Sequence, residues 1–442
     1  MLLQMSLSEK VRIFEGRYMK ASELKIKITE GALGKYSTLY SDIEGQRERY
    51  LGALDRFIEL YGDLDAELLS VPGRSEICGN HTDHNHGCVL AGAIDRDVIA
   101  VAARSTDGVI SFFSEGYPVS TITVADTKDP DAFENYTSDA LIAGMVNGFE
   151  KNGYCVGGMK VYSTSNVEKG SGISSSAAYE VMIGNALNHL YNGGSVANEE
   201  IAKLAQYAEN VYFGKPCGLM DQMACAVGGF VYIDFADKTN PEIVPIEFSL
   251  DKEGYALCIV NTGGNHADLN EDYASVPREM KAVAQALGKE VLREVSEEEL
   301  VCAISTLRES VGDRAVLRAL HFVRENNRVV KAREALLSGD LSGFFAAVNA
   351  SGASSFKYLQ NVYTIHNVNE QGISLALALA DGYLAGEGAS RVHGGGFAGT
   401  IQVFVSKARM GGLVELMNSI FGEGSAQAFS VRPLGAIRLE LN

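Results

Sequence analysis

Apolar residues recur three and four positions apart in several long stretches of the chain, which is the spacing of helices that bury one face. This pattern predicts helices over residues 50–61, 138–151, 175–191, 198–212, 314–338, 373–385 and 411–421. Shorter apolar segments bounded by turn residues predict strands over residues 98–103, 109–113, 158–162, 229–235, 256–261, 401–405 and 436–440. Because strands and helices interleave without a repeated strand–helix–strand rhythm, we expect an α+β fold rather than a doubly wound parallel sheet.

Three regions of the chain differ in their pattern. Residues 1–65 are charged and helically periodic, which predicts a helical N-terminal extension. Residues 66–245 alternate strand and helix patterns, and residues 246–442 contain the longest predicted helix. With 442 residues, 46% of them hydrophobic and 21% charged, the composition is that of a packed globular protein with two or three domains.

The charge and the cysteines narrow the function classes. A net charge of −18 repels nucleic acid and anionic membranes, so we expect neither as a partner, and any phosphate ligand needs a local positive site. The seven cysteines form no C-x-x-C pair, which argues against a disulfide framework and a zinc site. No signal-peptide core or bilayer-spanning apolar run is present, so the expectation is a cytoplasmic protein, taken to be a monomer.

Residues 170–180, GSGISSSAAYE, place glycines and serines directly before a predicted helix. Glycine lets the backbone approach a phosphate closely, and the free N–H groups of the first helical turn point at it. The segment is not a Walker A loop, because no Gly-Lys-Ser/Thr triplet follows at the required spacing. Taken alone, it could also be a glycine turn with a serine cap and no ligand.

Residues 72–87, PGRSEICGNHTDHNHG, gather many hydrogen-bonding side chains between glycines. Charged and amide groups of this kind bind polyhydroxylated ligands such as sugars. The rival interpretation is a metal site built from His81, His84 and His86. It is disfavoured because these histidines lie in a glycine-flanked turn rather than four apart on a helix, and no fourth ligand is evident.

Two further clusters follow. Residues 214–222, GKPCGLMDQ, come after the predicted helix that carries Glu209, and in isolation their acidic residue reads as a helix cap. Residues 390–400, SRVHGGGFAGT, form a glycine-rich loop before a predicted strand. Such a loop can approach a phosphate or another loop closely, although a plain bulged turn would have the same composition.

The four clusters, in this order, resemble the galactokinases of the GHMP sugar-kinase superfamily, over nearly all of the chain after the N-terminal extension. Residues 73–83 look like the family's sugar-binding signature and residues 170–178 like its phosphate loop. Residues 217–222 look like the segment with the catalytic aspartate, and residues 390–399 like the third, glycine-rich motif. The resemblance implies an ATP-dependent kinase that phosphorylates the anomeric C1 hydroxyl of galactose.

The resemblance also implies roles for single residues. Asp221 would take the proton of the C1 hydroxyl, and Arg74 would keep that aspartate ionised and neutralise charge on the transferring phosphoryl group. Mg²⁺ would be held by Ser176 and Glu209. The sugar would contact Asn80, His81, Asp83, Gly218 and Tyr273. The nucleotide would contact Gly170, Ser171, Gly172, Ser174, Ser175 and Ser176.

For the fold, the resemblance implies a two-domain GHMP kinase. Its N-terminal α/β domain would be like domain 2 of ribosomal protein S5, and its C-terminal domain would be ferredoxin-like. The active site would lie in the cleft between the two domains.

Departures from the family pattern concern the substrate. Asn80 stands in place of a glutamate, His84 in place of a tyrosine and Gly352 in place of a histidine, while Glu168 and Ala91 replace prolines. Loss of a charged hydrogen bond, worth about 1.5–3 kcal/mol, weakens galactose binding unless a neighbour compensates. The amide in place of the glutamate also removes a repulsion between two carboxylates, that of the glutamate and that of an anionic sugar. This repulsion is worth about 4 kcal/mol at about 4 Å and an effective dielectric of about 20.

Galactose therefore has two rivals, galacturonate and N-acetylgalactosamine, and Asn80→Glu is expected to improve galactose and worsen galacturonate. A hypothesis from another class is a sugar- and ATP-binding regulator without catalysis. The presence of both Asp221 and Arg74 favours the enzyme.

Overall fold

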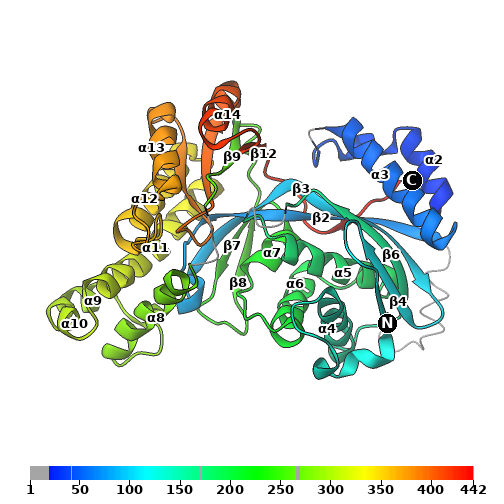
Figure 1. Ribbon diagram of the computed structural model, residues 1–442, viewed down its shortest axis with the longest axis horizontal. Helices are drawn as coiled ribbons and strands as arrows, with labels where there is room; N and C mark the ends of the chain where they lie inside the picture. Colours follow the sequence, from blue (N-terminus) through cyan, green and yellow to red (C-terminus); the bar gives the residue numbers. More distant parts are fainter. Residues whose placement is uncertain (1–18, 41, 169–171, 265–268, 442) are drawn as a thin grey trace.

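The computed structural model describes residues 19–40, 42–168, 172–264 and 269–441, and its described strands form two sheets (Figure 1). The larger sheet has the order β1-β2-β3-β6-β4-β5, with β13 also on β2, β7 on β3 and β8 on β7. Its strands are β1 Met19–Lys20, β2 Asp65–Cys78, β3 Cys88–Ser105, β4 Val109–Ser114, β5 Ser120–Thr123, β6 Gly158–Ser165, β7 Phe230–Asp234, β8 Glu242–Ile246 and β13 Ile437–Arg438. The smaller sheet has the order β10 Ala389–His393, β11 Thr400–Ser406, β9 Tyr255–Asn261 and β12 Ala426–Phe429.

Antiparallel pairing dominates both sheets. Among the described strands, only β4 and β6 pair in parallel. The predicted α+β class is thereby confirmed, because a doubly wound sheet would be mainly parallel. None of the helices in the described ranges is long and apolar enough to cross a bilayer.

Helices cover both faces of the larger sheet (Figure 1). One face carries α4 Ser138–Lys151, α5 Ser175–Tyr191, α6 Asn198–Tyr207 and α7 Met220–Val227. The other face carries α2 Ala21–Thr29 and α3 Ile43–Tyr61, which pack apolar side chains onto β2, β3 and β6.

The helices of residues 21–61 are anchored by charge as well as by apolar packing. Asp97 of β3 is fully buried. Its carboxylate accepts hydrogen bonds from Arg49 of α3 at 2.5 Å, from the Tyr40 hydroxyl at 2.7 Å and from Arg432 at 3.1 Å. A buried carboxylate needs such partners because its transfer from water is costly. The described part of the predicted helical extension is therefore an integral layer of the fold.

The remaining described helices lie toward the end of the molecule that carries the smaller sheet (Figure 1). They are α8 Asn270–Ala286, α9 Glu297–Cys302, α10 Ile304–Ser310, α11 Asp313–Ser338, α12 Leu341–Ser354, α13 Gly372–Leu384 and α14 Lys407–Phe421. Short 3₁₀ turns span Ala32–Tyr36, Asp83–Asn85, Val124–Lys128, Pro130–Ala132 and Leu292–Glu294, and π-helical turns span Ala208–Phe213 and Ser355–Leu359. The domain boundaries near residues 65 and 245 stay predictions, because the core under β2 and β3 also takes in side chains of α11 and α12.

Strand β2 differs most from its sequence pattern. Pro72 and Gly73 read as a turn, but the strand runs through them with a register shift between Pro72 and Arg74. Gly73 is needed there, since a Cβ atom would lie 2.7 Å from the carbonyl oxygen of Ile173. This close approach brings strand β2 against the segment that precedes α5.

Candidate active site

Asp221, in the first turn of α7, is held from two sides. Arg74 of β2 donates from Nε to Oδ1 at 2.8 Å, and its Nη2 forms an ion pair with the same oxygen at 2.8 Å. The Ser174 hydroxyl donates to Oδ2 at 2.6 Å. The Asp221 side chain nevertheless keeps 35% of its surface exposed. The carboxylate is thus fixed in direction and still open to a ligand.

Arg74 also ties Asp221 to the segment before α5. Its Nη1 donates to the carbonyl oxygen of Gly172 at 2.7 Å, and its backbone N–H donates to that of Ile173 at 3.1 Å. Burial opposes the charge of this guanidinium, but the carboxylates of Asp221 and Glu76 outweigh it and raise the Arg74 pKa. Arg74 is therefore a permanent cation beside Asp221.

The predicted phosphate-binding residues have different surroundings. Gly170 and Ser171 lie outside the described residues, and Gly172 packs against the ring of His393. Ser174 has φ +61° and directs its hydroxyl at Asp221 rather than at the helix. Ser175 and Ser176, in the first turn of α5, line a cavity of about 430 Å³.

Four aromatic residues also line that cavity: Tyr117, Tyr136, Tyr179 and Phe213. Tyr136 and Phe213 meet edge to face with centroids 5.3 Å apart, and Tyr136 is 68% exposed at the rim. A cavity that joins a helix N-terminus to flat aromatic surfaces suits a ligand with a phosphate at one end and a planar base at the other.

The predicted sugar-binding residues come together from three separate parts of the sequence. A Cβ atom on Gly218 would lie 2.7 Å from Oδ2 of Asp83, so these two residues are in contact. His81 Nε2 lies 2.9 Å from the Gly395 carbonyl oxygen, and the Tyr273 ring packs on the same glycine. Burial and the neighbouring His84 lower the pKa of His81 to about 4, so it is neutral at pH 7.

Asn80 is predicted to bind the sugar, but its side chain is engaged with the protein. Its Nδ2 donates to Glu76 Oε1 at 3.0 Å and to the Gly394 carbonyl oxygen at 2.7 Å. Its Oδ1 accepts from Asn361 Nδ2 at 2.7 Å and from Ser355 Oγ at 3.3 Å. An amide offers two N–H groups and two lone pairs, so all four positions are used. Sequence reasoning missed these partners, most of which are distant in the chain.

Glu209, a predicted metal ligand, is buried in the π-helical turn after α6. Its Oε1 lies 2.8 Å from the Lys215 ammonium, and its Oε2 accepts from Gln222 Nε2 at 2.7 Å. Gln222 also donates to Oε2 of buried Glu180, whose pKa is raised well above its usual range by burial and by Glu209. The buried Oε1 atoms of Glu180 and Gln222 have no hydrogen-bond partner among the residues that the structure describes.

This group of oxygens fits a hard cation. Ser176 and Glu180 are one helical turn apart on α5, and orphaned oxygens close to a carboxylate and a hydroxyl are donors that Mg²⁺ accepts. The described residues contain no group of three or more histidine, cysteine, aspartate or glutamate side chains placed to hold a metal by themselves. The donor set therefore suits an ion that takes most of its ligands from phosphate and water.

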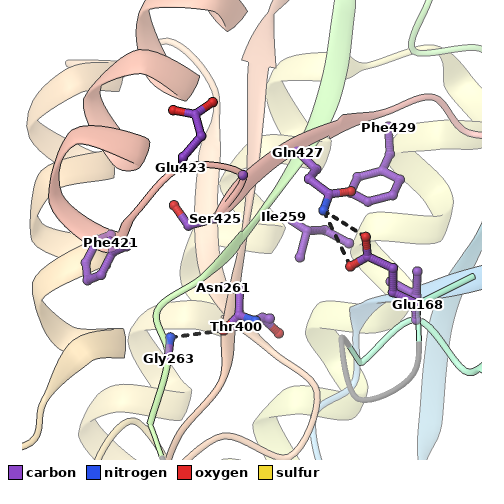
Figure 2. Close-up of a pocket in the computed structure, with 12 residues that line it drawn as sticks. Glu168, Ile259, Asn261, Gly263, Thr400, Phe421, Glu423, Ser425, Gln427 and Phe429 are labelled. Atoms are coloured by element: carbon purple, nitrogen blue, oxygen red, sulfur yellow. Dashed lines mark hydrogen bonds between the residues drawn. The ribbon is translucent and has the colours of Figure 1, made fainter.

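A second cavity, of about 290 Å³, lies beside strands β9, β11 and β12 of the smaller sheet, and Glu168 also lines it (Figure 2). Ile173 lines the same cavity. Across it, Gln427 of β12 donates to the Glu168 carboxylate at 3.3 Å. The segment that leads to the predicted phosphate loop is thereby joined to the smaller sheet.

Buried histidines give the fold a pH dependence. Burial and Arg74 lower the pKa of His393 to about 3. An unfolded histidine takes up a proton below about pH 6.5, so from pH 7 to pH 5 the unfolded state gains protons that the folded state refuses. We expect His393 to contribute about 2 kcal/mol to the fall in unfolding free energy over this range.

Urea denaturation of the wild type and His393→Gln at pH 7 and pH 5 measures this contribution. The variant is expected to lose about 2 kcal/mol less than the wild type. His84→Gln, which alters a side chain that is 43% exposed, is the matched control. Equal losses in the wild type and His393→Gln would contradict the assignment.

Two family models and several curated proteins match this chain. The model for the GHMP kinases N terminal domain matches residues 140–229, and that for the galactokinase galactose-binding signature matches residues 55–104. The chain is 32% identical over 382 residues to the galactokinase of Streptomyces coelicolor, covering 85% of this chain and 93% of that protein. It is 33% identical over 349 residues to that of Thermotoga petrophila, covering 78% and 91%.

Two solved structures extend the comparison. The Lactococcus lactis galactokinase complexed with galactose superposes with a TM-score of 0.72 at 26% identity, covering 88% of this chain and 100% of that one. The Methanococcus jannaschii mevalonate kinase superposes with a TM-score of 0.57 at 14% identity, covering 83% and 98%. The second likeness concerns the fold alone.

Proposed function

Because the chain belongs to the galactokinase family of the GHMP kinases, we propose that it transfers the γ-phosphoryl group of ATP to the anomeric C1 hydroxyl of galactose. The observation that carries this proposal is the Asp221 carboxylate, fixed by Arg74 and Ser174 yet open on one side. A regulator without catalysis could lose either Asp221 or Arg74, so the presence of both favours the enzyme.

In the reaction, Asp221 accepts the proton of the C1 hydroxyl while the C1 oxygen of the sugar bonds to the γ-phosphorus of ATP. The bond from that phosphorus to the β–γ bridging oxygen breaks, and ADP leaves with the electron pair. Phosphoryl transfer passes through a loose, anionic transition state, so positioning and charge neutralisation supply most of the catalysis. Arg74 supplies a positive charge beside the site of transfer.

Mg²⁺ would be held by Ser176 and Glu209, and when bound it neutralises charge on the phosphate oxygens. The neighbouring orphaned oxygen of Glu180 supports this placement. We expect Glu209→Gln to raise the free Mg²⁺ concentration for half-maximal turnover about tenfold or more. Glu199→Gln, on α6, is the control, and an unchanged Mg²⁺ requirement in Glu209→Gln would contradict the assignment.

The adenine base is proposed to lie in the aromatic cavity beside Ser175 and Ser176. Aromatic contacts are worth about 0.5–1.5 kcal/mol beyond area burial. Tyr136→Ala is therefore expected to raise the KM for ATP about three- to tenfold and to leave the KM for the sugar unchanged. Tyr383→Ala, on α13, is the control, and a rise confined to the sugar KM would place the nucleotide elsewhere.

We further propose that the protein acts as a monomer in the cytoplasm on two small molecules. Its seven cysteines are all free, as expected in a reducing compartment. Its net charge of −18 disfavours nucleic acid as a partner.

ADP release with Mg-ATP tests the function over galactose, galacturonate, N-acetylgalactosamine, arabinose and glucose. We expect turnover led by galactose. Saturable binding of sugar and ATP without turnover would move the protein to the regulator class. Turnover led by galacturonate or N-acetylgalactosamine would keep the kinase and replace its substrate.

A further inference from the structure

We infer that Glu76, rather than the residue at position 80, supplies a carboxylate that accepts a hydrogen bond from a sugar hydroxyl, with Asn80 and Arg391 holding it in place. This inference rests on the proposed function and names a specificity-determining residue for the same site.

Strand geometry places Glu76 on the side of Arg74. Pairing with β3 is regular from Arg74 to Glu76, so these side chains, two apart, point to the same face of the strand. Ser75, between them, points away and contacts His393 and Gln402. Arg74 reaches Asp221, and the Glu76 charge is one of the causes that raise the Arg74 pKa. Glu76 therefore lies on the side that faces the reacting group.

One oxygen of Glu76 is fixed by the protein and the other is available. Oε1 accepts from Asn80 Nδ2 and from Arg391 Nη2, both at 3.0 Å. Oε2 accepts no hydrogen bond from any described residue, and it is not among the buried atoms sealed from solvent. Glu76 as a whole is only 7% exposed. A nearly buried carboxylate with one oriented, unused oxygen suits a hydroxyl donor.

Two departures from the family pattern meet at this carboxylate. Asn80, in place of a glutamate, donates a hydrogen bond from its side-chain amide to Glu76. Gly352, in place of a histidine, leaves room for Arg391, since a Cβ atom there would lie 2.8 Å from the Arg391 Cβ. Asn80 has no hydrogen-bonding position left for a sugar, so the acidic group that the site lacks at position 80 is provided by Glu76.

The competing explanation is that Glu76 only balances the charge of fully buried Arg391. The two roles differ in their dependence on the sugar. A charged hydrogen bond to one hydroxyl makes the sugar that lacks this hydroxyl about ten- to hundredfold poorer in kcat/KM. A counter-ion affects all sugars alike.

The test is a cycle of protein and sugar deletions. The kcat/KM is measured for galactose and its 2-, 3-, 4- and 6-deoxy derivatives with the wild type, Glu76→Gln and Glu76→Asp. We expect one deoxy sugar to be about ten- to hundredfold poorer with the wild type. We call the ratio of kcat/KM for galactose to kcat/KM for a deoxy sugar the penalty of that deoxy sugar. With Glu76→Gln, the penalty of this one deoxy sugar is expected to fall to within about threefold, while the penalties of the other deoxy sugars remain.

Glu76→Asp and Glu67→Gln control for effects on folding and on charge. Glu76→Asp keeps a negative charge beside Arg391, but its shorter side chain moves the free oxygen away from the sugar. We therefore expect the penalty of the same deoxy sugar to fall with Glu76→Asp, even where Glu76→Gln folds poorly. Glu67→Gln, which changes another buried glutamate of β2 that pairs with Arg438, is expected to leave every penalty unchanged.

Three results would overturn the inference. They are unchanged penalties in a folded Glu76 variant, an equal loss for all sugars, and a wild type for which no deoxy sugar is tenfold poorer. Absence of sugar-dependent ADP release from the wild type would instead reject the proposed function.

Discussion

Asp221→Asn is expected to abolish turnover while nucleotide affinity stays within a few fold of the wild type. The amide keeps the shape of the side chain but cannot take the proton of the C1 hydroxyl, and loss of a positioned base costs about 10²–10⁴-fold in rate. It also removes the carboxylate that pairs directly with the buried guanidinium of Arg74. ADP release and titration with a fluorescent ATP analogue measure the two effects separately.

Ser174→Ala is the graded control for this experiment. It removes the 2.6 Å hydrogen bond to Asp221 Oδ2 but keeps the carboxylate and its contact with Arg74. We expect its kcat to fall about tenfold, in line with about 1.5 kcal/mol for a charged hydrogen bond. If Asp221→Asn turned over as fast as Ser174→Ala, Asp221 would not be the base.

Asn80→Glu is expected to destabilise the fold and to lower turnover with galactose and galacturonate alike. The sequence alone predicted better galactose turnover, because it placed this side chain in an open sugar site. In the structure, the new carboxylate would stand beside Glu76 Oε1, 3.0 Å from the present Nδ2, and would lose the donor to the Gly394 carbonyl. Two carboxylates about 4 Å apart repel by about 4 kcal/mol at an effective dielectric of about 20.

Urea denaturation and the sugar panel together measure this effect. The double variant E76Q/N80E is the control, because it leaves one carboxylate beside Arg391. We expect it to recover at least half of the stability that Asn80→Glu loses. An Asn80→Glu protein as stable as the wild type, with improved galactose turnover, would show that residue 80 faces the sugar directly.

The sequence was sufficient to predict elements with strong local signals. The bounds of α4 and α5 agree with the predicted helices over residues 138–151 and 175–191, because the periodic runs there end at turn residues. Helix α12 was missed because its small residues carry little periodic contrast. The full length of β2 was missed because Pro72 and Gly73 normally interrupt a strand. Packing against α11 forms the first of these elements, and pairing with β3 carries the second through Pro72 and Gly73.

The sequence also indicated which clusters meet at the site, but not how single side chains are used there. Ser174, which the sequence assigned to the nucleotide, also donates a hydrogen bond to Asp221, 47 positions away. Asn80 bonds Asn361, 281 positions away. Glu76 was passed over because its significance depends on Arg391, 315 positions away. Hydrogen bonds over such separations follow from the packed fold and leave no local pattern.

The reaction itself is tested most directly by identifying the phosphorylated product of galactose and Mg-ATP with ³¹P and ¹H NMR. The geometry around Asp221 predicts phosphate on C1, formed in equal amount to ADP and absent with Asp221→Asn. Phosphate on any other hydroxyl, or ADP formed without a sugar phosphate, would contradict the proposed sugar 1-kinase.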